Sequence, residues 1–172
     1  VGMGEYLAVQ GGAIYSTDAQ IVLRDSYINR TRASGTGGGI YANGGDLRIY
    51  GSEFHDCFSE QGGALMLKGN VVASVLKSSS FTKNSALYDG GAIYVEKGTL
   101  KSEDTTYKTN EALAFGGSLF VDRGAYIVSN RSVFDNNVAW SGGAIALGRE
   151  SDAILDNSFF QMNTARLGAG LY

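Results

Sequence analysis

The side-chain types that most often carry chemistry are scarce in this sequence. His55 is the only histidine and Cys57 is the only cysteine. A single histidine excludes a metal site with two histidine ligands and leaves little basis for a Ser-His-Asp triad. A single cysteine excludes an internal disulfide framework. We therefore expect that any catalysis in this segment would depend on carboxylates.

Carboxylates that act as an acid/base pair or bind calcium must gather on one face of the fold. Glu96 and Asp122 stand 26 residues apart, but Lys68 and Gly148 hold the neighbouring positions at a similar spacing. The double glycines do not form the phosphate-binding motif Gly-x-x-x-x-Gly-Lys-Ser/Thr. The sequence therefore predicts no catalytic, cofactor-binding or metal-binding residues, and we expect that the segment is not an enzyme.

The elements that would position these residues repeat along the chain. A Gly-Gly-Ala-Ile-Tyr element returns seven times with small variations, at intervals of 25–28 residues. Such a period is typical of a solenoid or another repeat architecture. The repeats begin near residues 11, 37, 62, 90, 116, 142 and 168.

A second motif lies in the other half of each repeat. An aromatic residue is followed three positions later by Asn in four of six cases, and Ala often follows two positions after that. Arg30 and Cys57 take the Asn position in the other two cases. The aromatic residues are Tyr27, Phe54, Phe81, Tyr107, Phe134 and Phe160, and the asparagines are Asn84, Asn110, Asn137 and Asn163.

Short β-prone runs predict an all-β fold. The Gly-Gly-Ala-Ile-Tyr element alternates as a half-buried strand, a second strand leads up to the aromatic residue, and a third segment runs from there through Asn-x-Ala. Three short strands in about 26 residues fit one coil of a single-stranded parallel β-helix, and parallel crossovers are right-handed. We expect about six coils over residues 1–172, forming one segment of a longer repeat array.

Stacked coils place equivalent residues in rows, which gives each motif residue a structural role. We expect the Ile/Leu positions and the aromatic residues to fill the core. The four asparagines should form a hydrogen-bonded ladder at a bend of left-handed backbone geometry. Cys57 should be a buried substitution in that ladder, His55 should point outward, and Lys77 should pair with Glu103.

The fifth position of the Gly-Gly-Ala-Ile-Tyr element should point away from the core, because it lies between two inward positions. It would form a largely aromatic stripe suited to binding. Two other interpretations stay open: the stripe lies under a loop or a neighbouring rod, or it only stabilises the coils. The stripe consists of Tyr15, Tyr41, Met66, Tyr94, Phe120 and Tyr172, with Ala146 in the sixth coil.

Charge and composition exclude several partners. The net charge is -3 and the sequence pI is about 5.1, without the basic patch that nucleic acid requires. The segment contains no run of 18 apolar residues, so the sequence predicts no membrane insertion within it. Asn29 and Asn130 stand in N-glycosylation sequons, which matter only if the source is eukaryotic and secretory.

The repeat resembles that of the chlamydial polymorphic outer membrane proteins, in which GGA[ILV] alternates with FxxN. The resemblance covers essentially the whole chain, although YINR (27–30), FHDC (54–57) and YKTN (107–110) depart from FxxN. The matching segments are GGAIY (11–15 and 90–94), GGAL (62–65), GGAI (142–145), FTKN (81–84), FDNN (134–137) and FQMN (160–163).

That resemblance implies an autotransporter passenger, displayed extracellularly or on the cell surface, that acts in adhesion. Its partner would be a host-cell or matrix receptor. The alternative function is a building block of an extracellular filament, sheath or appendage, with neighbouring subunits as partners. A carbohydrate-active β-helix enzyme is the third interpretation.

Overall fold

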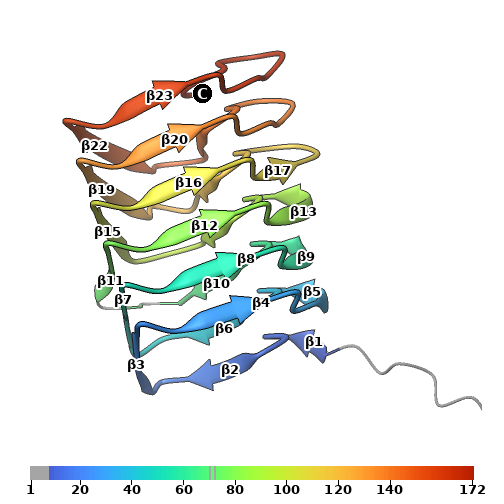
Figure 1. The fold of residues 1–172 in the computed structure, drawn as a ribbon, viewed down its shortest axis with the longest axis vertical. Helices are drawn as coiled ribbons and strands as arrows, with labels where there is room; N and C mark the ends of the chain where they lie inside the picture. Colours follow the sequence, from blue (N-terminus) through green and yellow to red (C-terminus); the bar gives the residue numbers. More distant parts are fainter. Residues whose placement is uncertain (1–7, 70, 72) are drawn as a thin grey trace, which may run out of the picture.

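The structure is a computed structural model that describes residues 8–69, 71 and 73–172 (Figure 1). These residues form 23 short strands and no helix. The chain rises coil by coil from the N-terminal end at the bottom of Figure 1 to the C-terminal end at the top. Equivalent strands of successive coils pair in parallel, so the described chain is a parallel β-solenoid of about six turns, as the sequence predicted.

The strands form four sheets that run along the rod; three of them contain six strands, and the fourth contains five and continues only as isolated bridges in the last coils. The first sheet contains the Gly-Gly-Ala-Ile-Tyr strands and the second contains the strands that follow them. The first sheet consists of β2 (Ile14–Thr17), β6 (Ile40–Asn43), β10 (Leu65–Lys68), β14 (Ile93–Val95), β18 (Leu119–Val121) and β21 (Ile145–Leu147). The second sheet consists of β3 (Gln20–Arg24), β7 (Asp46–Tyr50), β11 (Ala73–Lys77), β15 (Thr99–Glu103), β19 (Tyr126–Asn130) and β22 (Asp152–Asp156).

The third sheet carries the aromatic residues, and the fourth lies between the Asn position and the next double glycine. The third sheet consists of β4 (Tyr27–Asn29), β8 (Glu53–His55), β12 (Ser80–Thr82), β16 (Thr106–Lys108), β20 (Val133–Asp135) and β23 (Phe159–Gln161). The fourth sheet consists of β1 (Ala8–Gln10), β5 (Ala33–Thr36), β9 (Phe58–Gln61), β13 (Ser85–Asp89) and β17 (Glu111–Ala112).

The prediction of three strands per coil was wrong, because left-handed residues divide the chain more finely. One such residue separates the second strand from the aromatic strand, and another separates the aromatic strand from the fourth. The first group is Asp25, Gly51, Ser78, Asp104, Arg131 and Asn157. The second group is Arg30, Asp56, Lys83, Thr109, Asn136 and Met162. The left-handed residue therefore precedes the asparagine, and the expectation that Asn itself takes this geometry was wrong.

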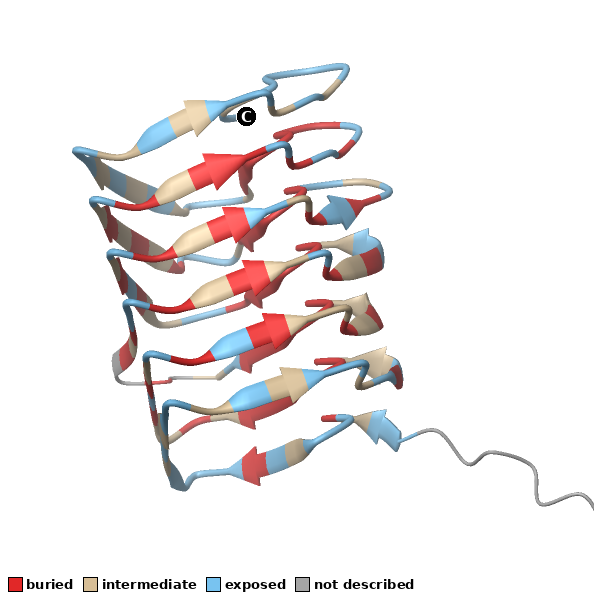
Figure 2. Cartoon of the chain, in the orientation of Figure 1, coloured by how far each residue is buried: buried red, intermediate tan, exposed pale blue. Residues whose placement is uncertain are grey.

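The core is a set of continuous rows inside the coils. Figure 2 shows buried residues concentrated in the middle coils and more exposed positions in the first and last. Phe54 stacks on Phe81 with ring centroids 4.7 Å apart, and Tyr107 stacks on Phe134 at 4.8 Å. The Ile and Leu positions of the first sheet pack against this stack as expected.

The first coil departs from the sequence alignment of the aromatic row. Ile28, not Tyr27, pairs with Phe54 in the third sheet, and Tyr27 is exposed. The Asn position of this coil is accordingly Thr31, whose hydroxyl lies 3.2 Å from the Cys57 sulfur. The motif in this coil is therefore Ile28-x-x-Thr31-x-Ala33, and the assignment of Tyr27 and Arg30 was wrong. Tyr27 was assigned to the row because it is aromatic, but a residue belongs to this row only if its side chain points into the core.

The asparagines lie in one buried row. Asn110 Nδ2 donates to Phe81 O at 2.9 Å and to Asn137 Oδ1 at 3.0 Å, and the Asn110 backbone N–H donates to the same Oδ1 at 3.0 Å. Asn84 and Asn137 repeat this pattern, with Asn110 and Asn163 as the following residues. Cys57 continues the row as a fully buried thiol, and its N–H donates to Asn84 Oδ1 at 3.0 Å.

The double glycine makes the corner between the fourth and first sheets. Gly90 has a φ of +65°, a geometry that L side chains rarely adopt. A Cβ at Gly91 would lie 2.1 Å from Gly117 O of the next coil, so only glycine permits this coil spacing. Nowhere in the described residues is a helix long and apolar enough to cross a membrane.

Candidate interaction surface

The predicted aromatic stripe lies outside the main core but is covered. Tyr41, Met66, Tyr94 and Phe120 form a separate buried cluster with Ala146. The expectation of an exposed stripe was therefore wrong for these coils, and exposure is limited to the two ends, Tyr15 (59%) and Tyr172 (52%).

The cover comes from the fourth sheet. Several of the residues that precede a double glycine lie beside the stripe. Thr36 and Gln61 line the same pocket as Tyr41 and Tyr94, and Phe115 stacks on Phe120 with centroids 5.6 Å apart. One open interpretation was that a loop or a neighbouring rod covers the stripe; here the covering residues belong to the same chain and precede the double glycines.

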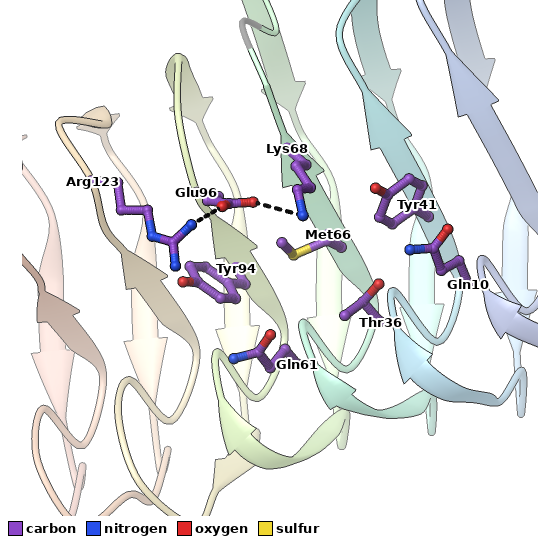
Figure 3. Close-up of a pocket in the computed structure, with 9 residues that line it drawn as sticks. All are labelled: Gln10, Thr36, Tyr41, Gln61, Met66, Lys68, Tyr94, Glu96 and Arg123. Carbon is purple, nitrogen blue, oxygen red and sulfur yellow. Dashed lines mark hydrogen bonds and ion pairs between the residues drawn. The ribbon is translucent and has the colours of Figure 1, made fainter.

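Met66 interrupts the stripe. Tyr15 stacks on Tyr41 with centroids 5.3 Å apart, and Tyr94 lies 5.0 Å from Phe120. Between these two ring pairs, the flexible Met66 side chain leaves a pocket of about 170 Å³ (Figure 3). We name this space the Met66 pocket.

Charged residues line one side of the Met66 pocket. Glu96 is only 7% exposed; its Oε2 lies 3.5 Å from Lys68 Nζ, and its Oε1 pairs with Arg123 (Figure 3). On the other wall, Gln61 Nε2 donates to Asp89 Oδ2 at 3.1 Å. The pocket therefore combines two aromatic rings with amide, carboxylate and cationic groups.

Burial favours the neutral forms of Tyr94 and Asp89 beside the pocket, because a charged group is less well solvated there than in water. Burial, reinforced by the charges of Asp122 and Glu96, raises the pKa of Tyr94. The Tyr94 hydroxyl donates to Asp122 Oδ2 at 3.3 Å. Burial also raises the pKa of Asp89. Tyr94 thus remains a hydrogen-bond donor at neutral pH.

The side of the solenoid formed by the fourth sheet and by the segments that continue it in the later coils presents exposed apolar side chains that the sequence analysis did not single out. Leu113 is 62% exposed and Trp140 is 53% exposed, and Arg166 lies over the Trp140 ring at 4.7 Å from its centroid. The only signal in the sequence was a large apolar residue directly after Asn-x-Ala in three consecutive repeats. We name this surface the fourth-sheet ridge. It consists of Leu87, Tyr88, Leu113, Val138 and Trp140.

Register places the members of the ridge on adjacent coils. Ala86 pairs with Ala112, so Leu87 and Leu113 follow one another along the rod. The bridge between Glu111 and Val138 and the bond from Ala112 N to Val138 O bring the next coil alongside, with Trp140 beyond Leu113. The ridge therefore runs parallel to the solenoid axis over three coils.

The remaining residues of interest are distributed around the solenoid. Asn29 is exposed and its Oδ1 lies 3.2 Å from Nδ1 of the half-buried His55. Asn130 is half-buried in β19, and Ser132 of its sequon is fully buried. Glycosylation at Asn29 and Asn130 stays a prediction.

The expected ion pair on the second sheet is present. Lys77 Nζ lies 3.2 Å from Glu103 Oε2. Arg131 extends the pair into a network: its Nε lies 2.8 Å from Asp104 Oδ1, and it also contacts Glu103. Hydrogen bonds from Arg131 lower the pKa of both Glu103 and Asp104. Within the described ranges, no three His, Cys, Asp or Glu side chains form a group that could hold a metal ion.

One comparison with known proteins identifies the repeat. Residues 78–96 match the Chlamydia polymorphic membrane protein (Chlamydia_PMP) repeat. Over these residues the chain is similar to that repeat. The matched stretch includes Phe81-x-x-Asn84 and Gly90-Gly91-Ala92-Ile93, so both motifs of one polymorphic membrane protein repeat lie inside it. No curated protein and no solved structure was found to match the chain.

The match to the polymorphic membrane protein repeat gives a general indication of location and activity. The family implies a surface-exposed region of an outer membrane protein. It is also a family of non-enzymatic surface proteins. The parallel β-solenoid agrees with such a repeat region, since one motif pair corresponds to one coil.

Proposed function

We propose that this segment is a non-catalytic part of an autotransporter-like passenger, displayed outside the cell, and that it acts in adhesion. The single observation that carries the proposal is the fourth-sheet ridge. Exposed contiguous apolar area on a soluble surface marks an interaction site more often than scattered apolar residues do. The partner would be a protein receptor on a host cell or in the extracellular matrix.

The ridge has the properties of a binding surface. Tyr88 and Trp140 are the aromatic types that dominate the energetics of protein interfaces. The carbonyl oxygens of both residues accept hydrogen bonds from a neighbouring coil, Tyr88 O from Ala114 N–H and Trp140 O from Arg166 N–H, which limits the conformational entropy lost on binding. Arg166 adds a cation that holds the Trp140 ring in place.

A triple substitution of the ridge tests the proposal. Tyr88→Ser, Leu113→Ser and Trp140→Ser together should weaken binding of the purified chain to cultured host cells by about tenfold or more, because interface anchors are removed. Flow cytometry with the fluorescently labelled chain measures this binding.

A matched control uses exposed apolar residues of the second sheet. Val22→Ser and Ile154→Ser remove exposed apolar side chains from another face and should leave cell binding unchanged. Equal binding by the ridge variant and the wild-type chain would contradict adhesion through this ridge.

The same ridge favours one alternative function. Because it runs parallel to the axis, a neighbouring rod could pack along it, as in an extracellular filament, sheath or appendage. Electron microscopy of the native full-length material separates the two functions. Single rods projecting from a membrane support adhesion, and rods packed side by side support the filament.

A further inference from the structure

The Met66 pocket is a defined break in an otherwise continuous row of rings. Tyr41 and Tyr94 lie one coil below and one coil above Met66, and Met66 pairs with both in the first sheet. Adjacent coils are about 4.8 Å apart, so the two tyrosines stand two coil steps apart with the buried Met66 side chain between them. Met66 is flexible and can move aside.

Two buried polar atoms in this pocket lack a hydrogen-bond partner. They are Thr36 Oγ1 and Glu96 Oε2, the latter with only its 3.5 Å ion pair to Lys68. Buried polar groups without a hydrogen-bond partner are unfavourable and call for an explanation. In Figure 3, Met66 lies between Thr36 and Gln61 on one side and Lys68 and Glu96 on the other. A group above Met66 would therefore reach both walls.

The chemistry of the lining favours a hydroxyl-rich guest. Besides the two tyrosines, six of the nine lining residues carry amide, hydroxyl or charged side chains. An aromatic side chain of a protein partner would leave these groups without hydrogen bonds. Thr36 Oγ1, Glu96 Oε2 and the tyrosine rings are buried while Met66 stays in place. With Met66 moved aside, a sugar hydroxyl could donate to Glu96 Oε2 and accept from Thr36 or Lys68, while the C–H face of the ring packs on tyrosine.

The size of the pocket limits the guest to one ring. Its volume of about 170 Å³ is below the range of about 300–1,000 Å³ typical of drug-sized ligands. We propose that the Met66 pocket binds a single neutral hexose unit, as the terminal sugar of a glycan. This site is separate from the fourth-sheet ridge.

Nuclear magnetic resonance on the whole chain tests the proposal. The chain is labelled with ¹³C at its methionine methyl groups and titrated separately with methyl glycosides of glucose, galactose and mannose. At least one sugar should shift the Met66 methyl resonance with a Kd on the order of 1 mM. Tetrahydropyran, a ring without hydroxyls, should cause no saturable shift.

Two variants report on the pocket by saturation transfer from protein to sugar. Met66→Phe fills the space and continues the ring stack, so it should fold and reduce binding about tenfold or more. Glu96→Gln keeps the shape and should reduce binding a few-fold, since a charge-assisted hydrogen bond is lost. Met162→Phe makes the same change at an exposed site and should bind sugar as the wild-type chain does.

The outcomes separate this proposal from adhesion through the ridge. Absence of a saturable Met66 shift with all three sugars overturns the sugar site, as does sugar binding that survives Met66→Phe. Cell binding by Met66→Phe is measured in parallel. Loss of sugar binding with intact cell binding supports the pocket and leaves the ridge as the adhesive surface.

Discussion

Each asparagine of the buried ladder satisfies backbone groups that no neighbouring strand reaches. Asn110 Oδ1 accepts from the Asn84 backbone N–H and from Asn84 Nδ2, both within 3.1 Å. Its Nδ2 donates to the backbone oxygen of Phe81, which lies in the aromatic strand of the preceding coil. A side-chain amide is needed here because it offers a donor and an acceptor at once.

Asn110→Ala should therefore destabilise the chain markedly. The substitution leaves the Asn84 N–H and the Phe81 carbonyl without partners in a dry interior, and we expect a loss of about 2–4 kcal/mol in the free energy of unfolding. Urea denaturation followed by circular dichroism measures the loss. Asn29→Ala, at an exposed position, is the control and should change stability by less than about 0.5 kcal/mol. Similar losses in both variants would show that the ladder has no special role.

Cys57 and Thr31 show how far substitution in the ladder is tolerated. Both keep a small polar side chain in contact across the first two coils, with the thiol and hydroxyl 3.2 Å apart. Burial raises the pKa of Cys57, which keeps the thiol protonated and suits a structural role. Cys57 was recognised from its spacing after Phe54, whereas Thr31 was not; the register of Ile28 with Phe54 revealed the position of Thr31.

At the scale of elements, the corner between the fourth and first sheets decides what is exposed. Its first glycine has positive φ in each coil, and its second lies against a carbonyl oxygen of the next coil. The corner closes the stripe of the first sheet under the fourth and turns the outer face of the fourth sheet to solvent. The surface that we propose for binding therefore lies in a less regular segment and not in the conspicuous motif.

Gly91→Ala tests this corner. Its Cβ would approach Gly117 O at 2.1 Å and Glu111 O at 2.5 Å, so two coils must separate and the neighbouring strand pairs must shift. We expect a loss of about 3 kcal/mol or more, measured by thermal and urea unfolding. Gly170→Ala is the control, because its nearest contact would be Phe160 Cδ1 at an ordinary 3.8 Å. A mild Gly91→Ala phenotype would mean that the coils adjust easily at this corner.

The sequence was enough to predict the features that repeat in every coil. It was not enough to predict those that depend on the corner between the fourth and first sheets. The period, the parallel stacking and the inward Ile/Leu and aromatic rows follow from residue spacing alone. The fourth strand was missed because the segments at 85–89 and 111–115 differ in residue type and form strands of five and two residues. The burial of Tyr41 and Tyr94 was missed because alternation gives direction relative to the core, not what lies outside it.

At the scale of the whole molecule, each coil contacts only its neighbours. Stability in such an array is close to a sum of coil and interface contributions. Phe81, Tyr107 and Phe134 stack in one row with neighbouring ring centroids 4.8–5.4 Å apart, so the interfaces between adjacent coils are nearly equivalent. The ridge and the Met66 pocket are local deviations in rows that are otherwise regular.

Deleting one complete coil should therefore leave a folded, shorter rod. Removal of residues 91–116 joins Gly90 to Gly117, which restores the double glycine and brings Phe81 onto Phe134 and Asn84 onto Asn137. Circular dichroism per residue should match the full chain, and unfolding should remain cooperative. Removal of residues 104–116, half of the same coil, joins Glu103 to Gly117 and deletes the aromatic, the Asn and one corner. That variant should lose its ordered β signal, because the rows on both sides fall out of register. If both deletions behave alike, the coil is not the unit of this fold, and stability must come from contacts that extend beyond neighbouring coils.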